Sequence, residues 1–336
     1  KMKKKYTKPV PIKFFSLGNV IFQITKLIRY TIRIFPKKKR IEKAMKWVLA
    51  HQDKSGDWGG IYPPMMYGSF MLKEMGYSND SSVLQRAKEA IERFHFVTKD
   101  EIMMQSCTSP VWDTAWSILA LLRGGMSEDD EIIKKACDWL YSKQIWAEGD
   151  WKVHAPDAKP GMWAFQHYND FYPDTDDTAV VLMSLLHTRK EKNAKKIIAF
   201  KAGCDWLYNM QNPDGGWAAF ERKIDKKILL KIPLNDLNNY IDPSTPELTG
   251  RILELFGRLG FTTESVFILK AIESLKMQQE GFGSWHGKWG VHYIYGAFGA
   301  LRGLSAVGYD MKQDWVQKSV RWLKETQNPD GGWGES

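Results

Sequence analysis

The feature that most constrains the fold is a short phrase that recurs five times along the 336-residue chain. Each copy joins a Gln to a Trp through a turn that contains glycine. The copies occupy residues 52–58, 144–151, 211–217, 279–285 and 327–333. Self-similarity of this kind is typical of chains that stack one structural unit many times. The phrase therefore predicts a repetitive architecture.

The residues before each phrase have the pattern of an amphipathic helix, in which apolar residues recur at positions i, i+3 and i+4. A second Trp stands five residues before the Gln in four copies, and Ser274 takes its place in the other. The turns stop these helices, because Pro cannot extend a helix and Gly accepts positive φ. The four tryptophans are Trp47, Trp139, Trp206 and Trp322.

Between the copies lie more apolar segments, which we expect to form a second set of helices. They cover residues 112–122, 177–186, 248–259 and 291–304. The repeat unit is then a hairpin of one apolar and one amphipathic helix, and several hairpins in a ring give an α/α barrel. A Gln amide can bond backbone groups at helix ends and so join successive hairpins. No segment shows sustained alternation of the strand type, so the predicted fold class is all-α.

Composition adds two constraints. The chain has fifteen Trp, and aromatic residues make up 13% of it, which is more than filling a core requires. Cys107, Cys137 and Cys204 show no metal-binding spacing and fit a reducing compartment.

Because the chain opens at Lys1 and stops soon after the last phrase, we interpret it as an internal fragment. An incomplete barrel would leave apolar helices uncovered, so we expect that it does not fold or work alone.

The net charge of +9 belongs to one segment. Residues 1–40 carry thirteen Lys or Arg and no acidic residue, whereas the remainder carries 35 basic and 39 acidic groups. This distribution argues against a nucleic-acid partner, which would require a basic face across the fold. Within residues 13–35, basic residues recur at helical spacing beside apolar ones, and the uncharged stretch is shorter than the roughly 20 residues that span a bilayer.

The segment 13–35 therefore predicts a helix lying in the membrane interface, with its cations near anionic headgroups. A core helix with solvated basic ends is an alternative, because amphipathicity does not separate the two. A signal peptide is a weaker alternative, since no small-residue cleavage site follows.

An acidic run precedes one of the apolar helices. Asp174, Asp176 and Asp177 stand immediately before residues 178–183. Clustered carboxylates raise the pKa of one member, and helix N–H groups stabilise an anion, as an acid that protonates an alkene requires. The alternative is that the run is a solvated helix N-cap, and this interpretation would be favoured if the run stood alone. A second run, residues 128–131, could suggest magnesium, but a surface helix start is favoured.

The Gln–Trp phrase and the Asp-Thr-Asp-Asp run resemble the QW and DxDD motifs of triterpene cyclases. From Trp58 to the end, the chain resembles bacterial squalene-hopene cyclases. The resemblance implies that residues 1–105 are the C-terminal part of a second α-barrel domain, with its membrane segment at about 13–35. Residues 106–336 would be most of the catalytic barrel. It also implies that Asp176 is the proton donor, that Asp174 and Asp177 support it, and that no metal or organic cofactor is used.

The same resemblance implies further site residues. Rings that face the substrate or its carbocations would be Trp112, Phe165, Phe220 and Trp289, because aromatic faces attract cations, although core packing remains the alternative for each. Ile61 and Tyr62 would also line the substrate site, and Arg251 and Tyr295 would support the acid. Three positions depart from the family pattern: Phe220 replaces Tyr, Arg251 replaces a His used by some members, and Tyr62 replaces Gln.

The expected function is cyclisation of squalene to hopene or hopanol-type triterpenes by an enzyme bound peripherally to the cytoplasmic side of the cell membrane. A tetraprenyl-β-curcumene cyclase is the alternative within the class. A protein prenyltransferase β subunit would need a zinc set of Asp, Cys and His, which the sequence lacks. A non-enzymatic helical-repeat scaffold would explain the repeats but not the acidic run with its aromatic rings. The resemblance leaves a homodimer open.

Overall fold

The computed structural model describes residues 23–24, 38–190, 193–226, 228–229 and 241–335. The chain forms two compact units. One comprises Lys1–Ala50 with Ile224–Ile241, and the other comprises His51–Lys223 with Asp242–Ser336. In the first unit, helix α2 (Lys38–Ala50) has no buried residue.

The predicted membrane segment, residues 13–35, lies outside the described residues apart from Gln23 and Ile24. Within the described part of the chain, the structure has no helix that is both long enough and apolar enough to cross a membrane.

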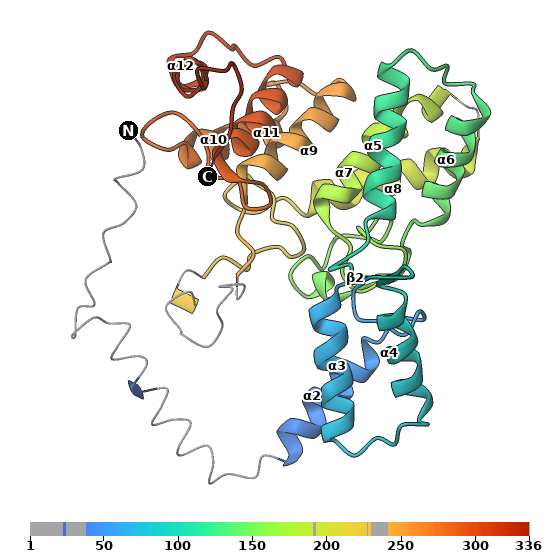
Figure 1. The fold of residues 1–336 in the computed structure, drawn as a ribbon. Helices are drawn as coiled ribbons and strands as arrows, with labels where there is room; N and C mark the ends of the chain where they lie inside the picture. The colour runs from blue at the N-terminus through green and yellow to red at the C-terminus, as the bar shows by residue number, and fades with distance from the viewer. Residues whose placement is uncertain (1–22, 25–37, 191–192, 227, 230–240, 336) are drawn as a thin grey trace. The chain divides into compact units, whose positions relative to one another are not determined.

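The second unit is built from helical hairpins, as the sequence predicts. Four apolar helices pack side by side in chain order: α5 (Pro110–Arg123), α7 (Thr175–Ser184), α9 (Pro246–Arg258) and α11 (His292–Ala306). Each also contacts the helix that follows it in the chain: α6 (Glu131–Ser142), α8 (Ala194–Asn209), α10 (Val266–Gln278) and α12 (Asp314–Glu325). Figure 1 shows α9 and α11 as neighbours. The all-α prediction is confirmed.

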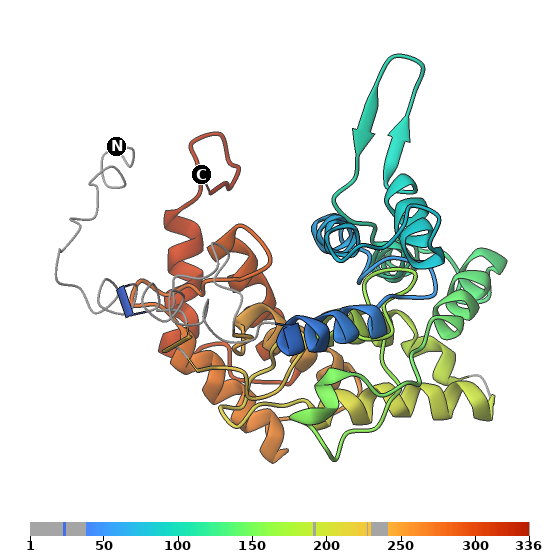
Figure 2. The same cartoon turned by 90° about the horizontal axis from the view of Figure 1, so that it is seen from below.

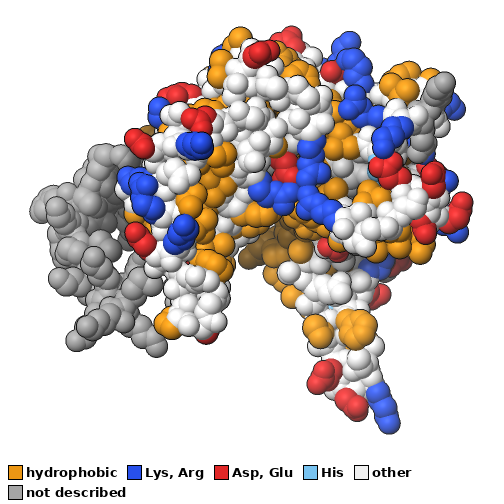
Figure 3. Space-filling view, turned by 90° about the horizontal axis from the view of Figure 1, so that it is seen from above, with side chains coloured by type: hydrophobic (Ala, Val, Ile, Leu, Met, Phe, Trp, Pro, Cys, Tyr) orange, Lys and Arg blue, Asp and Glu red, His pale blue; other side chains and the backbone are white. Residues whose placement is uncertain are grey.

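Before these hairpins, α3 (Tyr62–Glu74) packs on α4 (Ser82–Glu92), and a small antiparallel ribbon follows. Its strands are β1 (His95–Val97) and β2 (Ile102–Met104), which Figure 2 shows projecting from the helices. Figure 3 shows charged side chains at the tip of this projection. The ribbon was not predicted from the sequence. Neither face of the ribbon is buried; Ile102, for example, is 72% exposed. Its residues therefore did not have to alternate between apolar and polar, and the sequence pattern of a strand is missing.

The Gln of a phrase bonds its own turn, and in the first four phrases it also bonds a later helix; among the described residues, Gln327 of the fifth bonds only its turn. The Gln211 Nε2 amide donates to the carbonyls of Gly215 and Phe267, both at 2.8 Å, and Phe267 lies at the start of α10. Gln279 makes the same pair of bonds, to its turn and to Trp315 at the start of α12. The predicted role of these glutamines in linking hairpins is confirmed.

In the last three phrases the Trp indole bonds a carbonyl near the end of the preceding helix. The Trp217 indole Nε1 donates to the Leu207 carbonyl at 2.7 Å, and Trp285 bonds Leu275 at the same distance. Each acceptor stands four residues before the Gln of its phrase. Both rings are completely buried, so these tryptophans pack the core between hairpins.

The second phrase was wrongly assigned. Gln144 does bond the carbonyl of a turn glycine, at 2.7 Å, but this residue is Gly161. The indole that donates to Leu140, four residues before the Gln, belongs to Trp163 rather than to the predicted Trp151. An insertion separates this Gln from its turn, and the Gly149-Asp150-Trp151 stretch within it only imitates the phrase. The backbone of Gly161 has a φ of +145°, which an L side chain rarely adopts.

The two helices α9 and α11 approach so closely that their backbones touch. A Cβ atom on Gly250 would lie 2.1 Å from the Gly299 carbonyl oxygen, and one on Gly257 would lie 2.4 Å from the Ala306 carbonyl oxygen. Glycine is therefore needed at both levels of this contact. The close approach fixes which residues of α9 face those of α11.

Candidate active site

The acidic run starts helix α7, whose residues are nearly all buried between neighbouring helices. Asp174 is the N-cap, and its carboxylate accepts the Asp177 N–H at 2.6 Å. Thr175 extends the anchoring, because its hydroxyl donates to the Ala218 carbonyl at 2.7 Å. Asp174 is thus a helix cap as the alternative interpretation supposed, but it is a buried cap, only 6% exposed, rather than a solvated one.

Burial raises the pKa of all three aspartates. It raises the pKa of Asp174 to about 6, opposed by hydrogen bonds from Asp177 and reinforced by the charge of Asp176. Burial and the neighbouring Asp174 carboxylate raise the pKa of Asp177 well above its ordinary value. Burial also raises the pKa of Asp176, although Arg251 opposes that shift. The three carboxyl groups therefore lie in a poorly solvated site that favours their protonated forms.

Arg251 connects Asp176 to Tyr295. Its guanidinium Nη1 forms an ion pair with the Asp176 carboxylate, and its Nη2 donates to the Tyr295 hydroxyl at 2.9 Å. The Arg251 side chain is 3% exposed, and that of Asp176 is 14% exposed. Burial works against the charge of Arg251, but Asp176 and Tyr295 outweigh it and raise its pKa further. Arg251 therefore stays a cation, and its closest carboxylate is the most accessible of the run.

Aromatic rings surround this ion pair. The Arg251 guanidinium lies 5.2 Å from the Trp112 ring centroid and 5.7 Å from those of Trp116 and Tyr295. Trp112 in turn lies 6.1 Å from the ring of Phe165. Ring faces at these distances attract a cation and exclude water, so the site offers an apolar, cation-tolerant environment beside an acid.

Two other predicted ring residues form a separate pair. Phe220 and Trp289 meet edge to face, with centroids 6.1 Å apart. The backbone N–H of Trp289 donates to Glu247 at 3.2 Å, and Glu247 lies on α9 one turn before Arg251. The structure therefore places this pair next to the carboxyl that shares a helix with Arg251.

Glu247 and Trp116 were missed in the sequence. Glu247 is completely buried; its Oε1 accepts the Lys288 N–H at 2.7 Å, and its Oε2 has no hydrogen-bond partner among the described residues. Burial raises its pKa, against hydrogen bonds from the backbone, and Asp176 raises it further. The available signal was helical spacing, because Glu247 precedes Arg251 by four residues and Trp116 follows Trp112 by four.

Ile61 and Tyr62 lie in a different environment. Ile61 forms an isolated antiparallel bridge with Cys107 and is 42% exposed. The Tyr62 N–H donates to the Ser106 carbonyl at 2.9 Å, and its ring centroid lies 6.3 Å from that of His95. These contacts tie both residues to the base of the ribbon rather than to the acidic run.

The second acidic run is a helix start, as favoured. The Asp130 carboxylate accepts the Ile132 N–H at 2.8 Å and caps α6, and Glu128 pairs with Lys190 at 3.0 Å. Across the described ranges, no group of three or more His, Cys, Asp or Glu residues is placed to hold a metal ion.

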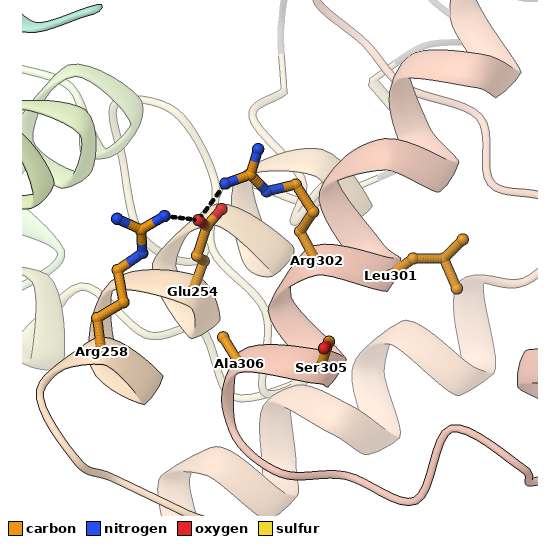
Figure 4. Close-up of a pocket in the computed structure, with 6 residues that line it drawn as sticks. All are labelled: Glu254, Arg258, Leu301, Arg302, Ser305 and Ala306. Carbon is orange, nitrogen blue, oxygen red and sulfur yellow. Dashed lines mark hydrogen bonds and ion pairs between the residues drawn. The ribbon is translucent and has the colours of Figure 1, made fainter. Parts of the chain in front are cut away.

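A second ion cluster lies one turn further along α9, beside a hollow of about 390 Å³. Figure 4 shows the guanidinium groups of Arg258 and Arg302 converging on the Glu254 carboxylate, and Arg123 reaches 4.0 Å from the same oxygen. From above, Figure 3 shows basic side chains gathered around an acidic one. This cluster contains no residue of the predicted site.

Comparison with known proteins places this arrangement in a family. The sequence profile of the squalene-hopene cyclase C-terminal domain matches residues 108–336, and the profile of the N-terminal domain matches residues 1–100. The chain belongs to the squalene-hopene cyclase family. The family matches favour neither a prenyltransferase β subunit nor a non-enzymatic repeat scaffold.

Relatives within this family carry several names. The chain is 36% identical to the squalene–hopene cyclase of Bradyrhizobium diazoefficiens, over 92% of this chain and 48% of that protein. It is 37% identical to dammaradiene synthase of Dryopteris crassirhizoma, over 88% and 46%. It is 39% identical to enfumafungin synthase of Hormonema carpetanum, over 88% and 23%. The chain thus spans about half or less of the length of these relatives.

Proposed function

We propose that this chain carries the protonating site of a class II terpene cyclase, with Asp176 as the acid. One observation supports this proposal most strongly. The accessible carboxyl of a buried acidic run is paired with a buried arginine, and tryptophan and tyrosine rings surround that arginine. A strong acid needs a stabilised conjugate base, and this pair provides one where water does not compete.

In the proposed step, the O–H bond of protonated Asp176 breaks and a C–H bond forms at a terminal alkene carbon of the substrate. The electron pair of the O–H bond stays on the carboxylate, where the Arg251 guanidinium stabilises it. The positive charge passes to the substrate and moves through successive ring closures, with Trp112, Phe165, Phe220 and Trp289 as cation-facing rings. Loss of a proton or capture of water ends the cascade.

Asp174 and Asp177 have a supporting role in this proposal. Burial raises the pKa of Asp174 to about 6 and that of Asp177 well above its ordinary value, so both carboxyls are more readily protonated than exposed aspartates. Protonation of either one reduces the negative charge beside Asp176 and leaves Arg251 to balance fewer carboxylates. The three carboxyls titrate as a group, so they can return a proton to Asp176 after each turnover.

The proposed substrate is squalene and the proposed product a hopene or hopanol-type triterpene. Squalene–hopene cyclases among the relatives support this choice, while dammaradiene synthase shows that similar chains bear names for other products. A tetraprenyl-β-curcumene cyclase is the second candidate. The replacement of Gln by Tyr62 and of Tyr by Phe220 bears on how the last cation is quenched.

We further propose a domain boundary near residue 105, which the profile matches ending at 100 and beginning at 108 support. The basic, apolar segment 13–35 supports peripheral attachment to the cytoplasmic side of the cell membrane. A homodimer is compatible with this arrangement.

The deciding experiment incubates the intact protein and its Asp176→Asn variant with squalene and analyses the products. We expect pentacyclic products from the parent and a loss on the order of 10³-fold or more in the variant, because an amide has no proton to give. Asp130→Asn, which alters a carboxylate cap on α6, is the matched control and should cyclise squalene normally. Undiminished cyclisation by Asp176→Asn would overturn the mechanism, and turnover of only the curcumene-type substrate would overturn the substrate assignment.

A further inference from the structure

The first turn of α11 is capped by a residue far along the chain. The N–H groups of His292 and Tyr293 each donate to Glu335 Oε2 at 2.9 Å, and that of Ile294 donates to Oε1 at 2.5 Å. The residue at the N-cap position itself is Val291, whose side chain makes no capping bond. Glu335 therefore supplies the acceptors that the first turn of this helix needs.

This cap differs from the local one on α7. Asp174 reaches only three residues ahead, whereas Glu335 lies 41 to 43 residues from the groups it binds. A carboxylate at a helix N-terminus is stabilised by charge-assisted bonds and by the helix dipole. Burial works against the Glu335 carboxylate, but its three backbone donors outweigh this effect and lower its pKa.

The capped turn leads directly into the site. Tyr295 is the residue after Ile294, and its hydroxyl accepts the bond from Arg251 at 2.9 Å. Gly290 lies close against its ring, since a Cβ atom at that position would lie 2.4 Å from the ring carbon Cγ. A small shift of the first turn of α11 would therefore move the hydroxyl relative to the guanidinium.

We infer that Glu335 is a positioning residue for the acid, acting through the first turn of α11 and the Tyr295–Arg251 hydrogen bond. The inference rests on the proposed function. Within the part of the chain that the structure describes, Glu335 forms no hydrogen bond or ion pair with the three aspartates; it bonds only the first turn of α11. It fixes the tyrosine that orients the arginine, and the arginine holds Asp176.

The test compares Glu335→Gln with the parent in the intact protein, using squalene. Gln keeps the length of the side chain but replaces the charge and one acceptor oxygen. We expect kcat to fall about 10-fold with KM changed less than about 2-fold, because positioning is lost while substrate contacts remain. Asp130→Asn weakens a carboxylate cap on α6 and should leave both constants unchanged.

A double-mutant cycle with Tyr295→Phe separates positioning from a general loss of stability. If Glu335 acts through the Tyr295 hydroxyl, Glu335→Gln has little further effect on kcat once that hydroxyl is gone. A full 10-fold loss that persists in the Tyr295→Phe background would overturn the inference, as would an unchanged kcat in the single variant. Both results leave the proposed function intact, since that depends on Asp176→Asn losing activity.

Discussion

Helix α9 carries two arginine–carboxylate clusters about one turn apart. In the first, Arg251 pairs with Asp176, and their side chains are 3% and 14% exposed. In the second, Glu254 accepts from Arg258 and Arg302, whose side chains are 30% and 31% exposed. The same pairs of chemical groups therefore lie in two environments on one helix.

Glu254 is itself only 9% exposed, so the difference between the clusters lies in the arginine: the guanidinium that faces the proposed acid is buried, whereas those that face Glu254 are partly exposed. Partly exposed pairs contribute little and are screened by salt. Arg258 also stands in the last turn of α9, where a cation complements the helix dipole, so the second cluster has an ordinary structural role. In the first cluster, burial raises the pKa of Asp176 while Arg251 opposes that shift. Burial favours the protonated acid, and the arginine stabilises the carboxylate that remains after proton transfer.

Among substitutions on α9, the largest expected effect comes from Arg251→Met. The carboxylate formed when Asp176 gives up its proton would lose its buried partner, so we expect cyclisation of squalene to fall on the order of 10²-fold or more. Arg302→Met is the matched change in the second cluster and should stay within about 3-fold of the parent. Product formation rates measure both. Equal losses in the two variants would contradict the distinction.

A second pair of variants tests the backbone contact at the two levels. Gly250→Ala and Gly257→Ala would each place a Cβ atom within 2.4 Å of a backbone oxygen on α11. We expect each to lower the free energy of unfolding by about 2 to 3 kcal/mol, because the helices must separate. Only Gly250→Ala should also lower kcat, since Gly250 adjoins Arg251. Chemical denaturation and steady-state kinetics on the same samples measure both effects. A fall in kcat of the same size in both variants would contradict the prediction.

The pH dependence of stability follows from Asp174. Burial raises its pKa to about 6, so the folded protein binds a proton that the unfolded chain releases at lower pH. The stabilisation is therefore present at pH below the ordinary aspartate value and is lost as pH rises through about 6, by on the order of 2 kcal/mol. Asp174→Asn should flatten the decline measured by denaturation between about pH 4 and pH 6.5. A slope unaffected by Asp174→Asn would refute the assignment.

Glu254→Gln is expected to give the smallest effect. The partly exposed arginines around it can be solvated by water, so the free energy of unfolding should change by no more than about 1 kcal/mol. Activity should stay within about 2-fold, and added salt should narrow the difference in stability further. A loss of activity comparable to that of Arg251→Met would mean that the two clusters act as one electrostatic unit.

The contrast between the two clusters was not visible in the sequence. Both arginines follow a glutamate by four residues on α9, since Arg251 follows Glu247 and Arg258 follows Glu254. Helical spacing places all four residues on one stripe, but it does not say which end of the stripe is covered by other helices. That depends on α5, α7 and α11, which come from distant parts of the chain.

The sequence by itself determined the helical hairpins, the linking role of the glutamines and the position of the acidic run at the start of an apolar helix. These features depend on local periodicity and turn chemistry, which neighbouring residues carry. Local pattern also gave one wrong prediction. Trp151 matches the phrase in sequence, but the tryptophan that makes the expected hydrogen bond is Trp163, which follows an insertion. The projecting ribbon escaped prediction because burial did not shape its residues.

Only the tertiary structure decided which groups meet at the acid. Arg251 reaches Asp176 across 75 positions of sequence, and Glu335 caps α11 across more than 40. The side chains that matter were all present in the sequence, but their proximity depends on the packing of α7 against α9 and of α9 against α11. Desolvation in that packed setting, rather than residue type, separates the proposed acid and its neighbours from a solvated helix cap.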